Sequence, residues 1–150
     1  MTAPTQLLLL TAFRSWAPRL TKALTDAGHT EIRPRHRQLF AHLDVQGTSV
    51  SFLARRMRIS AAAMGALVDD LVRLGYASPI SEKGARNILP TTRGVALINL
   101  LKDFDAQMEV SLQERLGAEP YRVLRSALQE LANDASLSNN LLAEQVEGSD

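Results

Sequence analysis

The feature that most constrains this chain is a pair of short amphipathic segments, 50–57 and 61–74, joined by the turn Arg58-Ile59-Ser60. In each segment the apolar residues recur three and four positions apart, which is the spacing of one helix face. Ser60 is a good N-cap for the second segment, and Gly75 ends it. The pattern is typical of a helix-turn-helix, whose second helix enters the DNA major groove. The residues expected in the core are Val50, Leu53, Ala54, Met57, Met64, Leu67, Val68 and Leu71.

The stretch after the second segment predicts a small β-hairpin. Strand-like pieces around 76–80 and 87–89 flank a turn at 82–85. A hairpin directly after a helix-turn-helix is the outline of a winged helix. We therefore expect a DNA-binding winged-helix lobe over about 34–91, whose first helix begins at Pro34 because proline suits the first turn of a helix.

Longer amphipathic helices are expected on both sides of this lobe. One covers about 5–27, and two lie in the region of about 92–133, the first ending at Gly117 and the second covering about 119–133. Pro18 should bend or divide the first of them, since it removes a backbone donor. The apolar faces of these helices exceed what a small lobe can cover, and burying apolar area contributes roughly 25 cal/mol per Å². This favours a homodimer in which the helices interdigitate across a two-fold axis. The alternative is that they fold back onto the core of their own chain.

At 150 residues the chain is most simply one domain. We expect residues 1–150 to form a mainly α winged helix-turn-helix with a small β-hairpin wing and N- and C-terminal dimerisation helices. A polar tail is expected over 134–150.

The net charge of +1 is divided unevenly along the chain. Residues 28–93 carry ten Lys and Arg against five acids, a net of +5, whereas residues 94–150 carry four against ten, a net of −6. This difference indicates that the basic middle of the chain faces a polyanion. The alternative is an ordinary solvated surface, on which small imbalances are common.

Composition and motifs exclude several other classes of protein. The chain has no Cys, which excludes disulfides, thiolate metal sites and cysteine redox sensing. Its three histidines lack the i, i+4 spacing of metal ligands, and it has neither a glycine-rich phosphate loop nor a nucleophile elbow. We therefore expect no enzyme activity, no catalytic residue, no metal and no cofactor. The run Leu7–Leu10 is too short to span a bilayer and nothing looks like a signal peptide, so a cytoplasmic protein without a membrane partner is expected.

In their order and spacing these residues resemble the MarR family of bacterial transcription regulators, from the first helix to about residue 133. The most specific part is Val50-x-x-Leu53-Ala54-x-x-Met57-x-Ile59-Ser60, followed by Leu67-Val68-Asp69-x-Leu71-x-x-x-Gly75. Thr91-x-x-Gly94 is similar to the family's Thr-x-x-Gly at the start of the long dimerisation helix. The resemblance implies a homodimeric winged helix that represses or activates a promoter at a pseudo-palindromic site in double-stranded DNA. It also implies release by a small-molecule effector, and repression is the favoured interpretation.

The chain departs from the family's usual pattern at several positions. Arg58 stands where the family usually has Gly, and Asp70 where it usually has Arg. Pro79 replaces an Arg in the first wing strand, and Glu82-Lys83-Gly84 replaces the Asp-x-Arg-like tip of a wing that is a few residues shorter than usual. These differences weaken the minor-groove contact that the resemblance implies. They support an alternative function, a dimeric winged-helix interaction protein with weak or lost sequence-specific DNA binding.

The second helix of the helix-turn-helix offers little that can hydrogen-bond a base. Its groove-facing residues are alanines and a glycine, which allow methyl contact to thymine and close backbone approach but no bidentate pairing. Basic residues border the turn and flank the wing, where they suit contacts to phosphates or to the minor groove. The alternative is that the alanines reflect helix propensity alone. The candidate DNA-binding residues are Arg55, Arg56, Arg58, Ser60, Ala61, Ala62, Gly65, Ala66, Lys83 and Arg86.

The resemblance further implies an effector cleft between the dimerisation helices and the DNA-binding lobe. On the residues alone, Trp16 is more typical of a core or a dimer interface. His36, beside two arginines at a helix start, is more typical of the surface than of a switch. The chemistry of a ligand stays open. The candidate ligand-binding residues are Phe13, Arg14, Trp16, His36 and Phe40.

Overall fold

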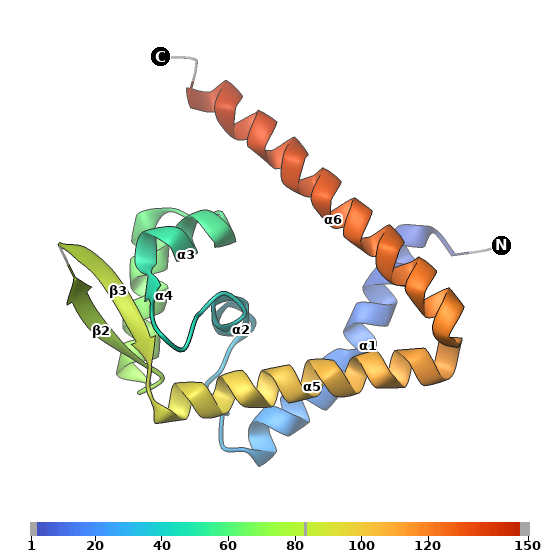
Figure 1. Ribbon diagram of the computed structural model, residues 1–150, viewed down its shortest axis with the longest axis horizontal. Coiled ribbons are helices and arrows are strands. Elements are labelled where there is room, and N and C mark those ends of the chain that lie inside the picture. The colour runs from blue at the N-terminus through green and yellow to red at the C-terminus, as the bar shows by residue number, and fades with distance from the viewer. Residues whose placement is uncertain (1–2, 83, 148–150) are drawn as a thin grey trace. The chain divides into compact units, whose positions relative to one another are not determined.

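The computed structural model describes residues 3–82 and 84–147 (Figure 1). The chain divides into two compact units, Met1–Phe104 and Asp105–Asp150. The elements in chain order are α1 (Thr5–Asp26), α2 (Pro34–Phe40), β1 (Thr48–Ser49), α3 (Val50–Met57), α4 (Ala61–Arg73), β2 (Ala77–Glu82), β3 (Ala85–Pro90), α5 (Thr92–Leu116) and α6 (Ala118–Glu147).

The first unit contains the expected winged helix, so the predicted mainly α fold class is confirmed. The bounds predicted for the helix-turn-helix match α3 and α4 to within one residue, because both helices begin at local caps. Oγ of Ser49 accepts the N–H of Phe52 at 3.4 Å, and Oγ of Ser60 accepts the N–H of Ala63 at 3.1 Å. The most deeply buried apolar side chains of the core are Leu39, Leu53, Met64, Val68, Leu71, Tyr76, Ile88 and Leu97.

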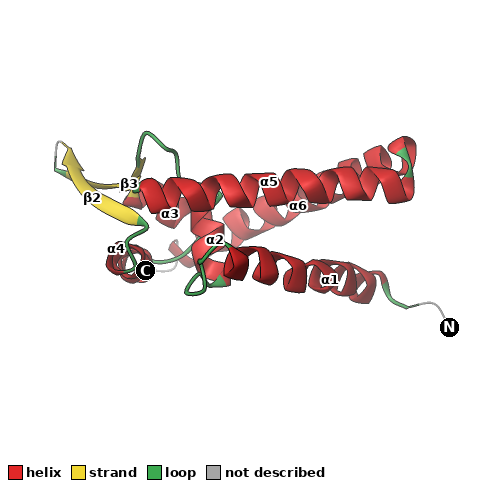
Figure 2. Cartoon of the chain, turned by 90° about the horizontal axis from the view of Figure 1, so that it is seen from below, coloured by secondary structure: helices red, strands yellow, loops and turns green. Residues whose placement is uncertain are grey.

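The wing is a three-stranded antiparallel sheet in the order β1-β3-β2. β2 and β3 pair along their whole length as one hairpin (Figures 1 and 2). β1 adds only two residues to the sheet, with Thr48 opposite Ile88. A two-residue strand is too short to show an alternating pattern, so the sequence gives no signal for β1.

A tight junction between the wing and α5 explains the Thr91-x-x-Gly94 pattern. Oγ1 of Thr91 donates to the carbonyl of Gly75 at 2.7 Å and accepts the N–H of Gly94 at 3.1 Å. A Cβ on Gly94 would stand 2.1 Å from the carbonyl oxygen of Tyr76, a separation that real Cβ atoms do not adopt. The first turn of α5 therefore needs glycine in order to lie against the backbone that follows α4.

Arg93 ties the start of α5 to the loop that follows α1, within the first unit. Its guanidinium lies 4.3 Å from the ring centroid of Tyr76, and it donates to the carbonyl of Leu74 at 2.8 Å and to Glu31 at 3.2 Å. The Tyr76 hydroxyl is 2.8 Å from Nδ1 of His29. Burial, and after it the charge of Arg93, lowers the pKa of His29. His29 is therefore a neutral structural histidine.

α1 runs through Pro18 without a break, so the proline does not divide the helix. The helix is ended by Gly28, whose φ of +78° lets the N–H of His29 donate to the carbonyl of Leu24 at 2.8 Å. No helix among the described residues is both long enough and apolar enough to cross a membrane. The N-terminal half of α1 nevertheless exposes the large apolar side chains of Leu7, Leu8, Leu9, Leu10 and Phe13.

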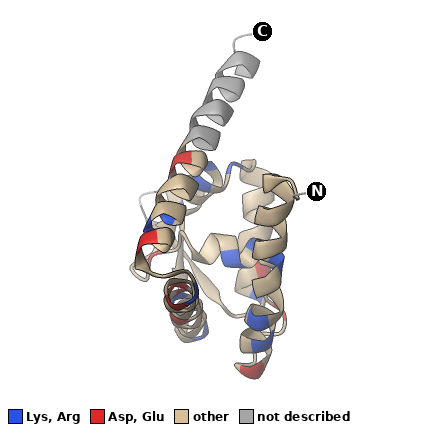
Figure 3. Cartoon of the chain, turned by 90° about the vertical axis from the view of Figure 1, so that its right-hand side faces the viewer, with Lys and Arg blue, Asp and Glu red and all other residues tan. Residues whose placement is uncertain are grey.

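In the second unit, the end of α5 is joined to α6 by Gly117, whose φ is +84°. Arg125 on α6 forms an ion pair with Glu109 on α5, and Tyr121 is buried. Residues of both charge signs occur along α6 (Figure 3). Large apolar side chains are exposed on α6 as well, at Val123, Leu124, Leu128 and Leu131.

The last helix is longer than the sequence predicted. We expected it to end near residue 133 and to be followed by a polar tail, but α6 continues to Glu147. The segment 121–147 contains neither glycine nor proline. Polar residues alone do not end a helix, and this segment lacks the glycine or proline that most often marks such an end.

Candidate DNA-binding surface

The turn between α3 and α4 depends on Arg58, which has φ 53° and ψ 49°. Among the described residues it is the one non-glycine residue with a positive φ. In this conformation the N–H of Arg58 donates to the carbonyl of Arg55 at 3.2 Å, and the N–H of Ile59 donates to that of Ala54 at 3.1 Å. A left-handed conformation costs a residue other than glycine about 1–2 kcal/mol. The chain therefore keeps an arginine at a backbone position that favours glycine.

The cap of α4 is the predicted one, and the first turns of the helix expose only small side chains. Ser60 uses its hydroxyl oxygen to accept the N–H of Ala63. Ala61, Ala62 and Ala66 are exposed and Gly65 is half-buried. The structure therefore brings together the small candidate residues of the sequence on one exposed face, at the N-terminal half of α4.

Three candidate arginines surround the start of this helix. Arg55 and Arg56 lie on the exposed side of the last turn of α3, and Arg58 is exposed in the turn itself. Lys83 lies outside the described residues. The turn before α4 therefore presents positive charge beside the N-terminus of a helix, which itself favours anions such as phosphate.

The fifth basic candidate, Arg86 on β3, reaches across to α4. Its Nη2 atom forms an ion pair with Oδ1 of Asp69. A Cβ on Gly65 would lie 3.8 Å from Nη1 of Arg86, so the guanidinium lies over this glycine. Sequence reasoning placed Arg86 beside the wing but did not find its partner. The one sequence signal was the spacing of four between Gly65 and Asp69, which puts both residues on one helix face.

His36 is buried, with 2% of its surface exposed, so the prediction of a surface histidine was wrong. Its Nδ1 accepts the N–H of Arg33 at 3.2 Å, and Nε2 lies 3.0 Å from Oδ2 of Asp70 on α4. Burial lowers the pKa of His36, against the opposing effect of Asp70. The pKa of Asp70 is itself lowered, first by its hydrogen bond from Arg73. His36 thus joins α2 to α4 as a neutral ring.

The other expected ligand-binding residues have different surroundings from one another. Phe40 is a core residue whose ring meets that of Tyr76 edge-on at 6.1 Å. Trp16 is half-buried on α1, whereas Arg14 and Phe13 are exposed. The structure does not gather them into one site.

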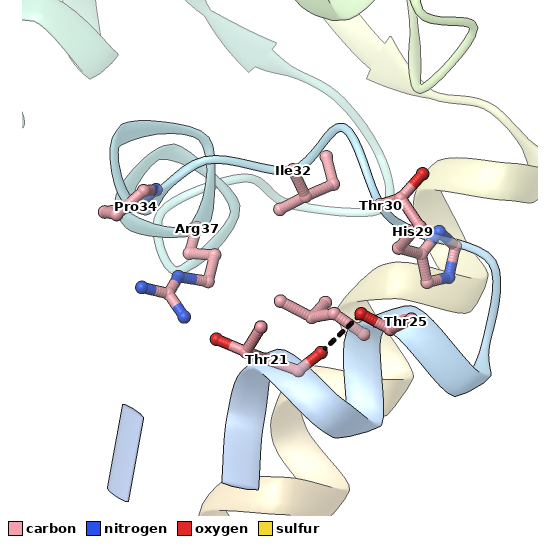
Figure 4. A pocket seen from close by; sticks show the side chains of 8 residues that line it. Thr21, Thr25, His29, Thr30, Ile32, Pro34 and Arg37 are labelled. Atoms are coloured by element: carbon pink, nitrogen blue, oxygen red, sulfur yellow. Dashed lines mark hydrogen bonds between the residues drawn. The ribbon is translucent and has the colours of Figure 1, made fainter. Parts of the chain in front are cut away.

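A cavity of about 120 Å³ lies between α1, α2 and the loop that joins them (Figure 4). Figure 4 shows Arg37 of α2 extending toward Thr21 of α1. Thr25 of α1 uses its hydroxyl to donate to the carbonyl of Thr21 at 2.9 Å. None of the expected ligand-binding residues lines this cavity. The residues that do are Thr21, Leu24, Thr25, His29, Thr30, Ile32, Pro34 and Arg37.

No protein-family model matches the sequence, and no curated protein matches it significantly. Solved structures do match the fold. FabT of Streptococcus pneumoniae in complex with DNA superposes with a TM-score of 0.76 at 13% identity, covering 87% of this chain and 94% of its own. A MarR family protein from Bacillus stearothermophilus has a TM-score of 0.67 at 18% identity, covering 87% and 92%. The Q18P mutant of MepR from S. aureus has a TM-score of 0.66 at 17% identity, covering 90% and 99%.

These structures are MarR-family winged-helix regulators, and the match covers most of this chain. At such low identity the likeness concerns the fold. The chain has the MarR-type winged-helix fold, as the resemblance in its sequence implied.

Proposed function

We propose that this chain, which has the fold of the MarR-family regulators, is a homodimeric transcription regulator that binds a pseudo-palindromic promoter site in double-stranded DNA. In this proposal the protein is cytoplasmic and has no enzyme activity. The observation that carries the proposal is the α3–turn–α4 unit. Its second helix exposes a smooth face of small residues, and arginines lie beside the start of that helix. A smooth face permits close approach to the groove floor, and the arginines suit the phosphates on either side.

The conformation of Arg58 supports a role for its charge. The left-handed conformation costs a residue other than glycine about 1–2 kcal/mol. Such a residue is found where the surrounding structure enforces the conformation or where its side chain has a function. An arginine in the turn before α4 would contact the phosphate backbone on the edge of the groove that α4 enters. Such contacts supply affinity for any sequence and make binding depend on salt.

The exposed apolar residues of α1 and α6 support the homodimer. Leu8 and Phe13 on α1 are 56% and 68% exposed, and Leu131 on α6 is 58% exposed. Apolar side chains at helical spacing are costly to leave in water, and a second copy of the chain would cover them. A two-fold dimer would set the two α4 helices about one helical turn of DNA apart, roughly 34 Å, and so require an inverted repeat.

Repression by such a dimer would need only occupancy of the promoter, and a small molecule would release it. The cavity lined by Thr21 and Arg37 is the place that we propose for this effector. Its volume of about 120 Å³ suits a molecule the size of a single ring, and the guanidinium of Arg37 favours an anionic one. Ligands bound there would act on α2, which packs against α4 through His36 and Asp70.

One observation favours a second candidate, a dimeric winged-helix protein that binds other proteins and lacks sequence-specific DNA binding. The first two turns of α4 carry no hydrogen-bonding side chain, and direct reading of base edges needs such groups.

Selection from randomised duplexes separates the two candidates. For the regulator we expect enrichment of an inverted repeat with half-sites about one helical turn apart. A pool that stays random after repeated rounds, with equally weak binding to every duplex, would contradict the regulator and favour the interaction protein.

A further inference from the structure

The exposed face of α4 lacks a polar side chain until Asp69. The residues before it on that face are Ala61, Ala62, Gly65 and Ala66. These groups can touch a thymine methyl group but cannot hydrogen-bond a guanine, an adenine or a cytosine. Before Asp69, any hydrogen-bonding side chain on this face must come from another element.

A guanidinium reaches this face from the wing. Alternate residues of a strand lie on one side of a sheet, and Arg86 alternates with Ile88 and Pro90 of β3, both of which are buried. Arg86 therefore leaves the sheet on the side of the helices. There its Nη2 atom pairs with Oδ1 of Asp69.

Gly65 provides the room in which this guanidinium lies. Gly65 and Asp69 are four residues apart, so they occupy the same face of α4. Nη1 of Arg86 is 3.8 Å from the place of a Cβ on Gly65, which is van der Waals contact. A larger side chain at 65 would take the place of the guanidinium. The wing arginine, the glycine and the aspartate thus form one arrangement on an otherwise apolar face.

We propose that Arg86 is the specificity-determining residue of this surface. It is a guanidinium that the wing supplies to the alanine-lined face of α4, where it hydrogen-bonds the O6 and N7 atoms of a guanine in the major groove. Its side chain is 46% exposed and carries five N–H donors, so the pairing with Asp69 leaves donors for a base. Asp69 fixes the orientation of the fork, which a flexible lysine could not match. The inference rests on the proposed DNA binding.

The experiment compares duplex selections by the wild-type chain and the variants R86A, R86K and R55A, followed by affinity measurements on single-base changes of the selected site. The wild-type half-site should contain one G·C pair whose replacement weakens binding roughly 5- to 150-fold. R86A and R86K should lose this preference and keep those at other positions. R55A is the charge-matched control. It should weaken the binding of every DNA sequence by the same factor and keep the G·C preference.

G65L is a second variant that leaves Arg86 in place. Its side chain should displace the guanidinium and abolish the same G·C preference. Unchanged melting temperatures of the variants would show that their folds are intact. The inference would be overturned if R86A kept the G·C preference, or if R86A weakened the binding of all sequences by the same factor. Either result would leave the proposed function standing. Failure of the wild-type chain to select any sequence would overturn both.

Discussion

Nε2 of His36 lies 3.0 Å from Oδ2 of Asp70, so the first turn of α2 is joined to the last turn of α4 by a buried ring. Because Nδ1 accepts the backbone N–H of Arg33, the ring carries its proton on Nε2 and donates it to Asp70. A second proton would have to occupy Nδ1, where the N–H of Arg33 already points. The contact therefore requires a neutral histidine.

The first prediction concerns pH. The pKa of His36 is lowered by burial, so the unfolded chain binds a proton that the folded chain does not. The free energy of unfolding should therefore fall as the pH drops below the ordinary histidine value of about 6.5, by at most about 1.4 kcal/mol per pH unit for one proton. Urea denaturation of wild type and H36Q between about pH 7 and 5 checks this. The free energy of unfolding of H36Q should depend less on pH than that of the wild type, and His29 should supply the dependence that remains. If the free energy of unfolding of H36Q changed with pH as steeply as that of the wild type, His36 would not be the group that titrates.

The second prediction concerns two glycines. G94A should lower the free energy of unfolding by about 3 kcal/mol, because its Cβ would meet the carbonyl oxygen of Tyr76. G65A is the matched control within a helix. Its Cβ would be in ordinary contact with Arg86, and alanine is the better helix former, so stability should rise by up to about 1 kcal/mol. Thermal and urea denaturation measure the stability of both variants. A G94A variant as stable as the wild type would contradict the close contact between Gly94 and the carbonyl of Tyr76.

The third prediction concerns the arginines around the turn. R55E and R58E should weaken binding to all DNA sequences, because phosphate contacts carry no sequence information. Each lost contact should reduce the slope of log affinity against log salt by about 0.9. K22E, a charge reversal on α1, is the control and should change neither quantity. Unchanged affinity of R55E and R58E would show that another surface binds DNA.

The fourth prediction concerns assembly. F13E places a charge on the exposed apolar face of α1 and should convert the dimer to a monomer, which analytical ultracentrifugation detects. F52E changes a phenylalanine that is also exposed, but on α3 of the winged helix, and should leave the dimer intact. A dimer that survives F13E would remove α1 from the proposed interface.

Local signals explain why the helices were predictable from the sequence. Ser49 and Ser60 cap the helices that follow them, and Gly28 ends α1, so each boundary is specified within a few residues. The seventeen-residue separation of Asp69 and Arg86 leaves no such local pattern. Their pairing depends on how the wing folds against α4.

The same limit applies to His36. Its neighbours in the sequence are Arg35 and Arg37, which suggest the surface, whereas its burial depends on Asp70 in another helix. Gly94 shows the opposite situation: its pattern was visible in the sequence, but the reason for it appears only beside the carbonyl of Tyr76. Tertiary contacts between distant residues therefore decide the parts of the site that sequence patterns do not show.

The central claim is that this winged helix recognises a specific DNA site. The most direct test titrates the protein into the selected duplex, and separately into a scrambled duplex of the same composition, with fluorescence anisotropy as the readout at one fixed salt concentration. A dimeric regulator predicts two chains per selected duplex and an affinity at least about 1,000-fold tighter than for the scrambled one. Equal affinity for the two duplexes would contradict the claim that this winged helix recognises a specific site.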